Sequence, residues 1–346
     1  MKMLLHKNNT GFSLVELMIA IVVSTILITA VSATYIAQRR SYVVQENVSE
    51  INTQAKIAHD VIVNDIKTAG FGVPADMNQD PVNSLTTVVS FSDSDVAPDT
   101  ITIVGGFRIL GTLWPKGFGP GDNIPCPASV PLGSATVNID YEDPTNVFNT
   151  TDKSSLSIDG INYARVINVS GNTITLDRPL SQDFPLLDLN GDGFCDTGRP
   201  VYLIEDTTFC VDAGEVLHRI RRNANPAACA PAANSDDDEL AENIEDLQFA
   251  YAVDTDNDGQ IDDLNNDGVI DDADYIDNTS ASFGTGIDPA TIRAVRVNVL
   301  ARANQGDSNY EGLGNPPSPI ENRTHDPTND NFRRRWWRTI VNIKNQ

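Results

Sequence analysis

The chain has 346 residues, of which 48 are Asp or Glu and 24 are Lys or Arg, and its formal net charge is -24 at pH 7. This acidity argues against nucleic acid as a partner, because neutralisation of phosphates requires clustered Lys and Arg side chains. The length allows one large hydrophobic core or two smaller ones, and we expect one elaborated domain after the N-terminal region.

A short basic leader, residues 1–11, comes first, and a long apolar run follows it. The leader contains Lys2 and Lys7 but no apolar core of the length of a secretory signal. The run over residues 17–38 has no charged side chain, and as a helix it would measure about 33 Å, enough to cross a bilayer once. Glu16 stands at the start of this run. Because a charge near hydrocarbon costs roughly 2.5 to 3.5 kcal/mol on insertion scales, Glu16 is predicted to have a functional role.

The leader and the apolar run together resemble the class III signal of type IV prepilins and pseudopilins. The matching residues are Gly11 as the last leader residue, Phe12 as the new N-terminus and Glu16 five residues into the mature chain. The resemblance implies that a prepilin peptidase cleaves between Gly11 and Phe12 and methylates the Phe12 amine. It also implies that Glu16 compensates the N-terminal ammonium of a neighbouring subunit, a pairing that is strong in a low dielectric. An ordinary signal anchor is the alternative.

Apolar residues continue beyond this run in steps of three and four over residues 44–69. The spacing predicts an amphipathic helix, and the turn residues that begin at Gly70 predict its end. We expect one continuous helix from about Ser13 to Ala69, with a transmembrane or filament-core part over 12–38 and an amphipathic part over 39–70. A coiled-coil stalk would show the same spacing.

Residues 71–346 are predicted to form a β-rich head with long loops. Strands are expected over residues 100–104, 164–169, 173–177, 201–204, 207–211, 247–253, 292–301 and about 335–343. The Pro- and Gly-rich residues 114–133 are predicted to form a loop. Ser235 resembles a helix N-cap and predicts a short helix over residues 236–244. The predicted fold class is α+β and pilin-like, with the long helix packed on an antiparallel sheet.

Four cysteines lie in the predicted head: Cys126, Cys195, Cys210 and Cys229. None forms a CxxC motif, and two disulfides would fit an oxidising periplasm. Three pairings are open. We favour Cys210 with Cys229 because they are close in the chain, which leaves Cys126 with Cys195. Free buried thiols are the alternative.

Two consecutive acidic segments in the loop over residues 254–274 have oxygen ligands at the spacing that calcium prefers. The first segment has acids at positions 1, 3, 5 and 9 and Gly259 at position 6. The second segment has Gly268 at position 6 and adds an acid at position 12, and it resembles the EF-hand-like loops of dockerins. The expected calcium ligands are Asp254, Asp256, Asp258, Asp262, Asp263, Asn265, Asp267, Asp271 and Asp274.

A solvated acidic turn is the alternative for this loop, although carboxylates so close together would repel each other strongly. Magnesium fits less well, because it prefers fewer protein ligands and more water. The division of ligands between the two segments and the number of ions stay open. A weaker third candidate consists of Asp188, Asn190, Asp192 and Asp196, with Gly193 at position 6 and Arg199 at position 12.

No sequence motif indicates catalysis. The chain lacks GxSxG, HExxH, a P-loop and a GxGxxG motif after a strand, and its four histidines are scattered. Pairs of acids could serve a glycosidase, but here they lie in DxDxDG loops that explain them better. We expect no enzyme activity.

The C-terminal third resembles PilW-type minor pilins of type IV pili. The resemblance covers about residues 236–346 and rests on residues 242–251, the Asp-rich turn, residues 294–297 and the Arg-rich last strand. It implies a minor pilin that joins other minor pilins and the major pilin in a priming complex near the pilus tip and can present a tip adhesin. It also implies an inner-membrane helix and a periplasmic head, and later a place in the pilus on the cell surface. A J-like minor pseudopilin of type II secretion and a calcium-dependent adhesive module carried on the pilus are the alternatives.

Overall fold

The computed structural model of the protein describes residues 13–73, 88–140, 155–221, 229, 236–277, 288–307, 310, 319–325 and 330–344. The chain divides into two units, residues 1–50 and 51–346. The leader and the predicted cleavage residues Gly11 and Phe12 lie outside the described residues.

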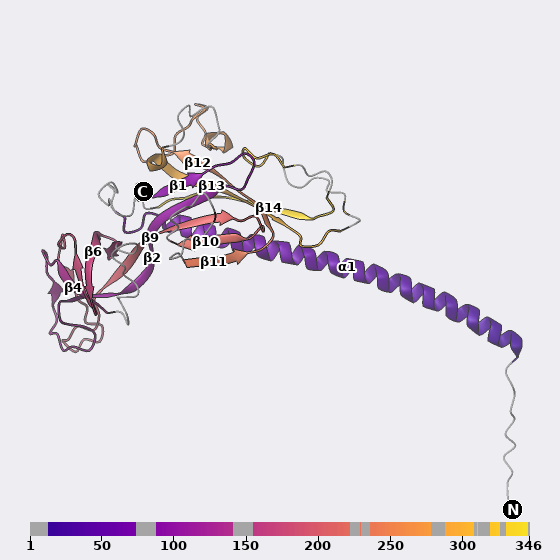
Figure 1. Cartoon of the computed structure of the whole chain (residues 1–346), viewed down its shortest axis with the longest axis horizontal. Coiled ribbons are helices and arrows are strands. Elements are labelled where there is room, and N and C mark those ends of the chain that lie inside the picture. The colour runs from indigo at the N-terminus through magenta and orange to yellow at the C-terminus, as the bar shows by residue number, and fades with distance from the viewer. Residues whose placement is uncertain are drawn as a thin grey trace, which may run out of the picture. The chain divides into compact units, whose positions relative to one another are not determined.

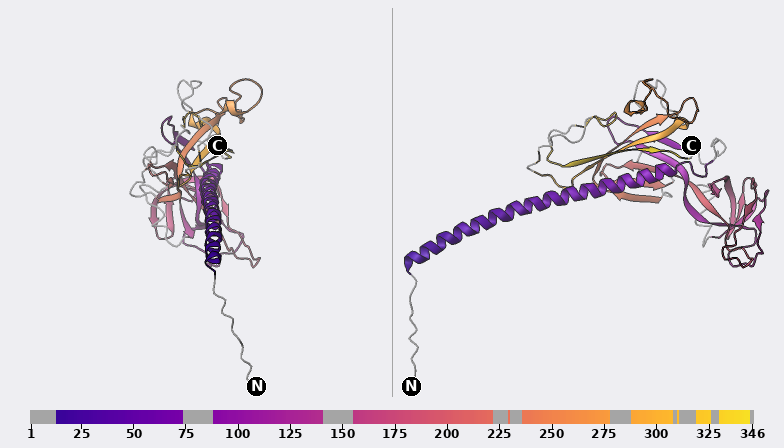
Figure 2. Two further views of the ribbon diagram at one scale, coloured as in Figure 1. Left: turned by 90° about the vertical axis from the view of Figure 1, so that its right-hand side faces the viewer. Right: turned by 180° about the vertical axis from the view of Figure 1, so that it is seen from behind.

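A single helix, α1, runs without a break from Leu14 to Thr68 (Figure 2). This agrees with the predicted helix from about Ser13 to Ala69. Among the described residues, α1 is the one helix that is long and apolar enough to cross a membrane. The hydroxyl groups of Thr25 and Thr29 each donate to the carbonyl oxygen four residues earlier at 2.8 Å. These hydroxyls are therefore hydrogen-bonded within the apolar run.

In the second unit, the C-terminal part of α1 buries one apolar stripe against the head. The stripe consists of Ile51, Ala55, Ala58, Ile62 and Ile66. Its spacing of three and four residues is that of one helix face, as predicted. The helix ends at Thr68, and beyond it Gly70 has a φ of 78° and donates its NH to the carbonyl oxygen of Val104 at 2.8 Å.

The predicted antiparallel sheet is confirmed, although its strands form one large and two smaller sheets. The large sheet has the order β1-β2-β4-β7-β6-β5-β9-β10-β11, and β2 also pairs with β9. Its strands are β1 (Val89–Ser92), β2 (Thr100–Pro115), β4 (Thr136–Asp140), β5 (Ser155–Ile158), β6 (Asn162–Ser170), β7 (Thr173–Leu176), β9 (Arg199–Val211), β10 (Leu217–Arg221) and β11 (Asp236–Ala241). The second sheet contains β12 (Ile244–Val253), β13 (Ile292–Arg302) and β14 (Arg334–Asn342), and the third contains β3 (Ser129–Val130) and β8 (Phe184–Pro185). Two short 3-10 helices are η3 (Asp272–Asp274) and η4 (Pro289–Thr291).

The pairing of β2 with β9 closes part of the large sheet into a barrel. The ring runs β2-β4-β7-β6-β5-β9 and returns to β2, and it forms one end of the head in Figure 1. This part of the head has its own hydrophobic core, which contains the buried side chains of Leu113, Trp114 and Phe184. We call this part the barrel lobe. Closure removes the free edges of these six strands.

A second core joins α1 to both larger sheets. It receives Ile62 from α1, Ile103 from β2, Phe209 from β9, Phe249 from β12 and Val297 from β13. The head therefore has two main hydrophobic cores within one unit, one of the two possibilities that the chain length allowed.

The prediction of a short helix over residues 236–244 is wrong, because residues 236–241 form the strand β11. Its acids face the basic side chains of Arg219, Arg221 and His218 on the neighbouring strand β10. Asp238 Oδ2 lies 2.8 Å from Arg219 Nη2 and 3.1 Å from Arg221 Nη2, and Asp237 Oδ1 lies 2.9 Å from His218 Nδ1. These cross-strand charge pairs stabilise the strand over the local helix signal.

The predicted loop over residues 114–133 is partly wrong, because β2 extends to Pro115 and β3 occupies Ser129–Val130. The segment is held by the disulfide between Cys126 and Cys195, whose Cα atoms lie 5.3 Å apart. The other disulfide joins Cys210 and Cys229, with a Cα separation of 5.6 Å. The favoured pairing is therefore confirmed.

Residues 319–325 lie against the outer face of the three-stranded sheet. Asp246 of β12 is 1% exposed, and its Oδ1 accepts a hydrogen bond from Arg323 Nη1 at 2.5 Å. Its Oδ2 lies 2.7 Å from His325 Nε2. Since a buried charge is costly unless it is paired, these contacts anchor the segment to the sheet.

Candidate metal-binding loops

The loop over residues 254–274 leaves the end of β12 and returns to pair with the same strand. The Asp262 NH donates to the Val253 carbonyl oxygen at 2.8 Å. Tyr251 and Ile276 exchange two backbone hydrogen bonds of 2.8 and 2.9 Å. The loop is therefore held at both ends by a buried strand.

In the first segment, backbone NH groups point at the predicted ligand side chains. The Asp254 carboxylate accepts hydrogen bonds from the NH groups of Asp258 and Gly259, each at 3.1 Å. Asp256 Oδ1 accepts from the same Asp258 NH at 3.1 Å. The turn needs left-handed backbone at Asn257 (φ 61°) and Gly259 (φ 86°). Glycine and asparagine are the residues that adopt this conformation most readily.

The second segment repeats this arrangement. Asp263 accepts hydrogen bonds from the NH groups of Asp267 at 3.2 Å and Gly268 at 2.6 Å. Asn265 Oδ1 accepts from the Asp267 NH at 2.8 Å. Asn266 and Gly268 have φ values of 59° and 85°. Positions 4 and 6 of both segments therefore have the same left-handed backbone.

Each segment is closed by an acid that binds the NH group following the first predicted ligand. Asp262 Oδ2 accepts from the Thr255 NH at 2.9 Å in the first segment. Asp274 Oδ1 accepts from the Leu264 NH at 2.8 Å in the second. The closing acid thus stands at position 9 in the first segment and at position 12 in the second.

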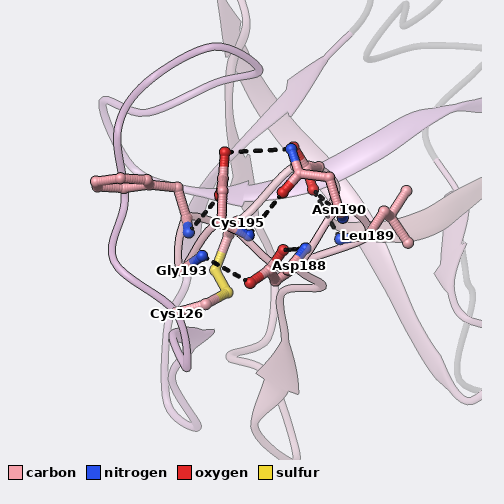
Figure 3. The surroundings of a disulfide bond; sticks show 10 residues. Cys126, Asp188, Leu189, Asn190, Gly193 and Cys195 are labelled. Atoms are coloured by element: carbon pink, nitrogen blue, oxygen red, sulfur yellow. Dashed lines mark hydrogen bonds between the residues drawn. A yellow bond between two sulfur atoms is a disulfide. The ribbon is translucent and has the colours of Figure 1, made fainter.

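The weaker candidate loop has the same geometry in the barrel lobe (Figure 3). Asp188 accepts hydrogen bonds from the NH groups of Gly191 at 2.6 Å and Gly193 at 3.0 Å. Asp196 closes this loop through the Leu189 NH at 2.7 Å. Backbone NH groups are bound by all four predicted ligands: Asp188, Asn190, Asp192 and Asp196. Three loops in one chain therefore share one turn structure.

One group of three carboxylates converges within the part of the chain that the structure describes. One ligand oxygen from each of Asp254, Asp256 and Asp262 lies within 4.8 Å of the other two. A set of ligands made only of oxygen suits a hard cation such as Ca²⁺. The other acids predicted as ligands in this loop do not belong to the group: Asp258, Asp263, Asp267, Asp271 and Asp274.

Arg293 is a partner of Asp254 that the sequence pattern did not identify. Arg293 Nε donates to Asp254 Oδ2 at 3.0 Å, and the Asp254 side chain is fully buried. Burial disfavours its charged form, but hydrogen bonds from Arg293 and Gly259 outweigh this and hold the pKa of Asp254 below its usual range. The two residues are 39 positions apart in the chain, so no local motif could reveal the pair.

Two family models match the chain. The model Type IV Pilus-assembly protein W matches residues 202–345, and the model Prokaryotic N-terminal methylation motif matches residues 6–32. The chain belongs to the PilW-type minor pilins. Comparison with curated proteins and with solved structures gives no match.

In this PilW-type pilin, the methylation motif contains Gly11, Phe12 and Glu16. Glu16 lies in the first turn of α1, where its Oε2 accepts a hydrogen bond from the Ser13 NH at 3.1 Å. The region matched by the PilW model begins in β9 and includes the loop over residues 254–274. The third candidate loop and strands β4 to β7 of the barrel lobe precede that region. The family assigned from the sequence is confirmed, and the protein is a structural component related to type IV pili.

Proposed function

We propose that this PilW-type pilin takes part in type IV pilus assembly as a member of a priming complex at the pilus tip. The observation that carries the proposal is the joining of a methylation motif to a PilW region in one chain through the continuous helix Leu14–Thr68. In this proposal, α1 anchors the subunit in the inner membrane with the head in the periplasm. The helix then enters the filament core, where the head contacts other minor pilins, the major pilin and a tip adhesin.

The carboxylate of Glu16 is central to this proposal. Among the described residues 14–38, Glu16 is the one charged side chain. In a filament core of low dielectric, an unpaired carboxylate costs several kcal/mol, and a neighbouring subunit's N-terminal ammonium offsets that cost.

Replacement Glu16→Gln is expected to reduce incorporation of the chain into pili at least about tenfold, because the ion pair with the neighbouring subunit is lost while the shape is kept. The measurement is the ratio of this chain in sheared pili to this chain in the membrane, by quantitative immunoblot. Glu46→Gln is the matched control, because Glu46 lies on the same helix beyond the apolar run. Normal incorporation of the Glu16→Gln chain would contradict the proposed filament role.

We further propose that calcium binds the loop over residues 254–274 and stabilises the head. The support is the convergence of Asp254, Asp256 and Asp262 on a strand-anchored loop, with left-handed glycines at the turns. Neutralisation by a divalent cation would relieve the repulsion between these carboxylates. The residues that would hold the ion are the three converging acids, with Asp258 and the second segment close by in the chain.

Calcium at 100 times its dissociation constant is expected to stabilise the full-length chain by about 2.7 kcal/mol, because only the folded loop assembles the ligands. The measurement is the melting temperature of the chain in detergent with CaCl2, with MgCl2 and with a chelator. In Asp256→Ala, most of the calcium-dependent rise should be lost. Asp256 is exposed, so its removal leaves no buried partner unpaired.

The exposed Asp95→Ala serves as the control variant, since it removes one acid outside the loop. It should retain the full response to calcium. Equal melting temperatures of the unaltered chain in CaCl2 and in chelator would show that the calcium proposal is wrong, and it would leave the assembly proposal standing.

A further inference from the structure

The two larger sheets end in strands whose free edges are protected to different degrees. An exposed edge presents unpaired NH and C=O groups and invites pairing with another chain, so proteins shorten, charge or cover such edges. The edge strand β1 has only four residues. The edge strand β11 carries the sequence Asp236 to Glu239, four acids in succession, which is a charged edge.

The edge of β12 is covered by the chain itself. Asp99 donates its NH to the Leu247 carbonyl oxygen at 2.8 Å and accepts from the Phe249 NH at 3.0 Å. Further along, Ile276 pairs with Tyr251, as described above. The outward-facing polar groups of β12 are therefore bonded along the strand.

The outer edge of β14 is different. The Ile343 NH donates to the Arg293 carbonyl oxygen at 2.9 Å, and the Ala303 NH donates to the Arg333 carbonyl oxygen at 2.8 Å. The main-chain NH and C=O groups of the odd-numbered residues of this strand therefore point toward β13. In an antiparallel ladder the alternate residues then direct their NH and C=O groups away from the partner strand. In β14 these include Trp336, Arg338 and Ile340. Within the described ranges, no hydrogen bond reaches the main-chain groups on this side.

The strand is long and regular enough to act as a template. It has nine residues and pairs with β13 without a bulge. Ile340 is 48% exposed, and isoleucine is one of the residues that favour β-strands. Arg338 is held by an ion pair with Asp272 of the loop over residues 254–274, and the Trp336 Nε1 donates to Asn298 Oδ1 at 3.1 Å. The outer face of β14 is therefore fixed in place.

The charge at this edge indicates what it can bind. Arg335 is exposed, and no ion pair joins it to any residue in the described part of the chain. A second copy of this chain would bring a further net charge of -24 and would be repelled overall. A different polypeptide with a carboxylate near Arg335 and an apolar side chain near Ile340 would complement the edge.

We propose that β14 is a docking edge to which an extended segment of another pilus subunit adds as a fourth strand, with an acidic residue meeting Arg335 and an apolar residue meeting Ile340. The main-chain hydrogen bonds supply affinity, and the side chains select the partner. That the partner is a pilus subunit rests on the proposed function; the open edge does not.

Hydrogen–deuterium exchange tests this directly on the full-length chain. The amides of peptides that span residues 334–342 are compared between the chain in detergent and the chain in pili sheared from cells. Exchange at the outward-facing NH groups should be fast in detergent and at least about tenfold slower in pili. Equal exchange in the two samples overturns the proposal. If protection rises with the concentration of the purified chain alone, the strand that pairs with β14 comes from a second copy of this chain, and the proposed partner is wrong.

Two variants test the same edge by its chemistry. Ile340→Pro removes an outward NH that β13 does not use, so the sheet should keep its ladder while strand addition is blocked. Ile340→Thr is the matched control, because it retains the NH and the β-branched shape. Arg335→Glu tests the charge without any change to the main chain. Both Ile340→Pro and Arg335→Glu should lose protection of residues 334–342 in pili, and Ile340→Thr should retain it.

The outcomes separate this proposal from the proposed function. If deletion of the gene abolishes piliation while β14 exchanges freely in pili, only the docking edge is wrong. If deletion leaves piliation normal, the assembly role is wrong, and the exchange of β14 in pili that contain the chain still decides the edge. If the melting temperature of the Ile340→Pro chain lies well below that of the unaltered chain, this variant is destabilised. The exchange of residues 334–342 in the Arg335→Glu chain then decides whether β14 is a docking edge.

Discussion

Replacement of both Cys126 and Cys195 by serine is expected to destabilise the barrel lobe by about 4 kcal/mol. The disulfide closes a loop with a sequence separation of 69, and in the chain-entropy model the stabilisation grows with loop length. The bond also ties the candidate loop that ends at Asp196 to the segment that contains Cys126, as Figure 3 shows. Without it, backbone bonds such as that from the Cys126 NH to the Gly193 carbonyl oxygen at 2.9 Å hold the segments together alone.

The measurement uses a local fluorescent probe. The chain has three tryptophans, and Trp114 alone lies in the barrel core, whereas Trp336 and Trp337 lie on β14. In a background with Trp336→Phe and Trp337→Phe, urea unfolding followed by fluorescence reports the barrel lobe. The double serine variant should unfold at a clearly lower urea concentration.

The second disulfide supplies the matched control. Cys210 and Cys229 close a loop with a sequence separation of only 19, so their replacement should cost less, about 3 kcal/mol. In the same Trp336→Phe and Trp337→Phe background, the Trp114 transition of this control variant should stay nearly unchanged. An unaltered Trp114 transition in the Cys126→Ser/Cys195→Ser variant would show that this bond does not stabilise the lobe.

Asp246→Ala is expected to cost about 3 to 5 kcal/mol, because it leaves Arg323 and His325 without the carboxylate that both face in a buried site. Removal of one member of a buried ion pair costs more than the pair contributes, since the remaining charge stays desolvated. Asp246→Asn retains the shape and some hydrogen bonds, so its loss should be smaller.

Urea unfolding of the full-length chain, followed by the fluorescence of Trp336 and Trp337, measures this loss. Asp60→Ala is the control, because Asp60 forms an exposed pair with His59 and such pairs contribute at most about 1 kcal/mol. Equal stabilities of Asp246→Ala and Asp60→Ala would mean that residues 319–325 do not depend on this carboxylate.

The elements that the sequence predicted well are those with a local periodic signal. The helix over residues 14–68 follows from an uncharged run and a buried stripe at helical spacing, with glycine at its end. The hairpin of β6 and β7 follows from alternating residues on either side of Gly171, whose φ is 58°. In both cases neighbouring residues carry the whole signal.

The predictions that failed depend on partners that are distant in the chain. Residues 236–241 have a helix-start signal, but β10 supplies Arg219 and Arg221 opposite their acids and draws them into a strand. Pairing of β2 with β9, which closes the barrel, joins segments about a hundred positions apart, such as Leu113 and Arg199. Long-range pairing of this kind leaves no pattern within a short window.

The candidate metal-binding loops also have features that the local sequence predicts and one that depends on a distant partner. The turns of the three acidic loops were predictable, because Gly259, Gly268 and Gly193 stand where a left-handed backbone is required and their neighbours are oxygen ligands. The ion pair of Arg293 with Asp254 was not, since it forms only when β13 pairs with β12.

The sequence by itself therefore determined the family, the long apolar helix with Glu16 and the shape of each acidic turn, because a local order of residues specifies all three. Tertiary structure alone decided which carboxylates converge and that β2 pairs with β9 to close the barrel lobe. It also decided that, in the described part of the chain, β12 is covered while the outer main-chain groups of β14 have no partner. The physical reason is that charge pairing, barrel closure and edge protection are contacts between segments far apart in the chain, and their free energies exist only after the sheets have formed.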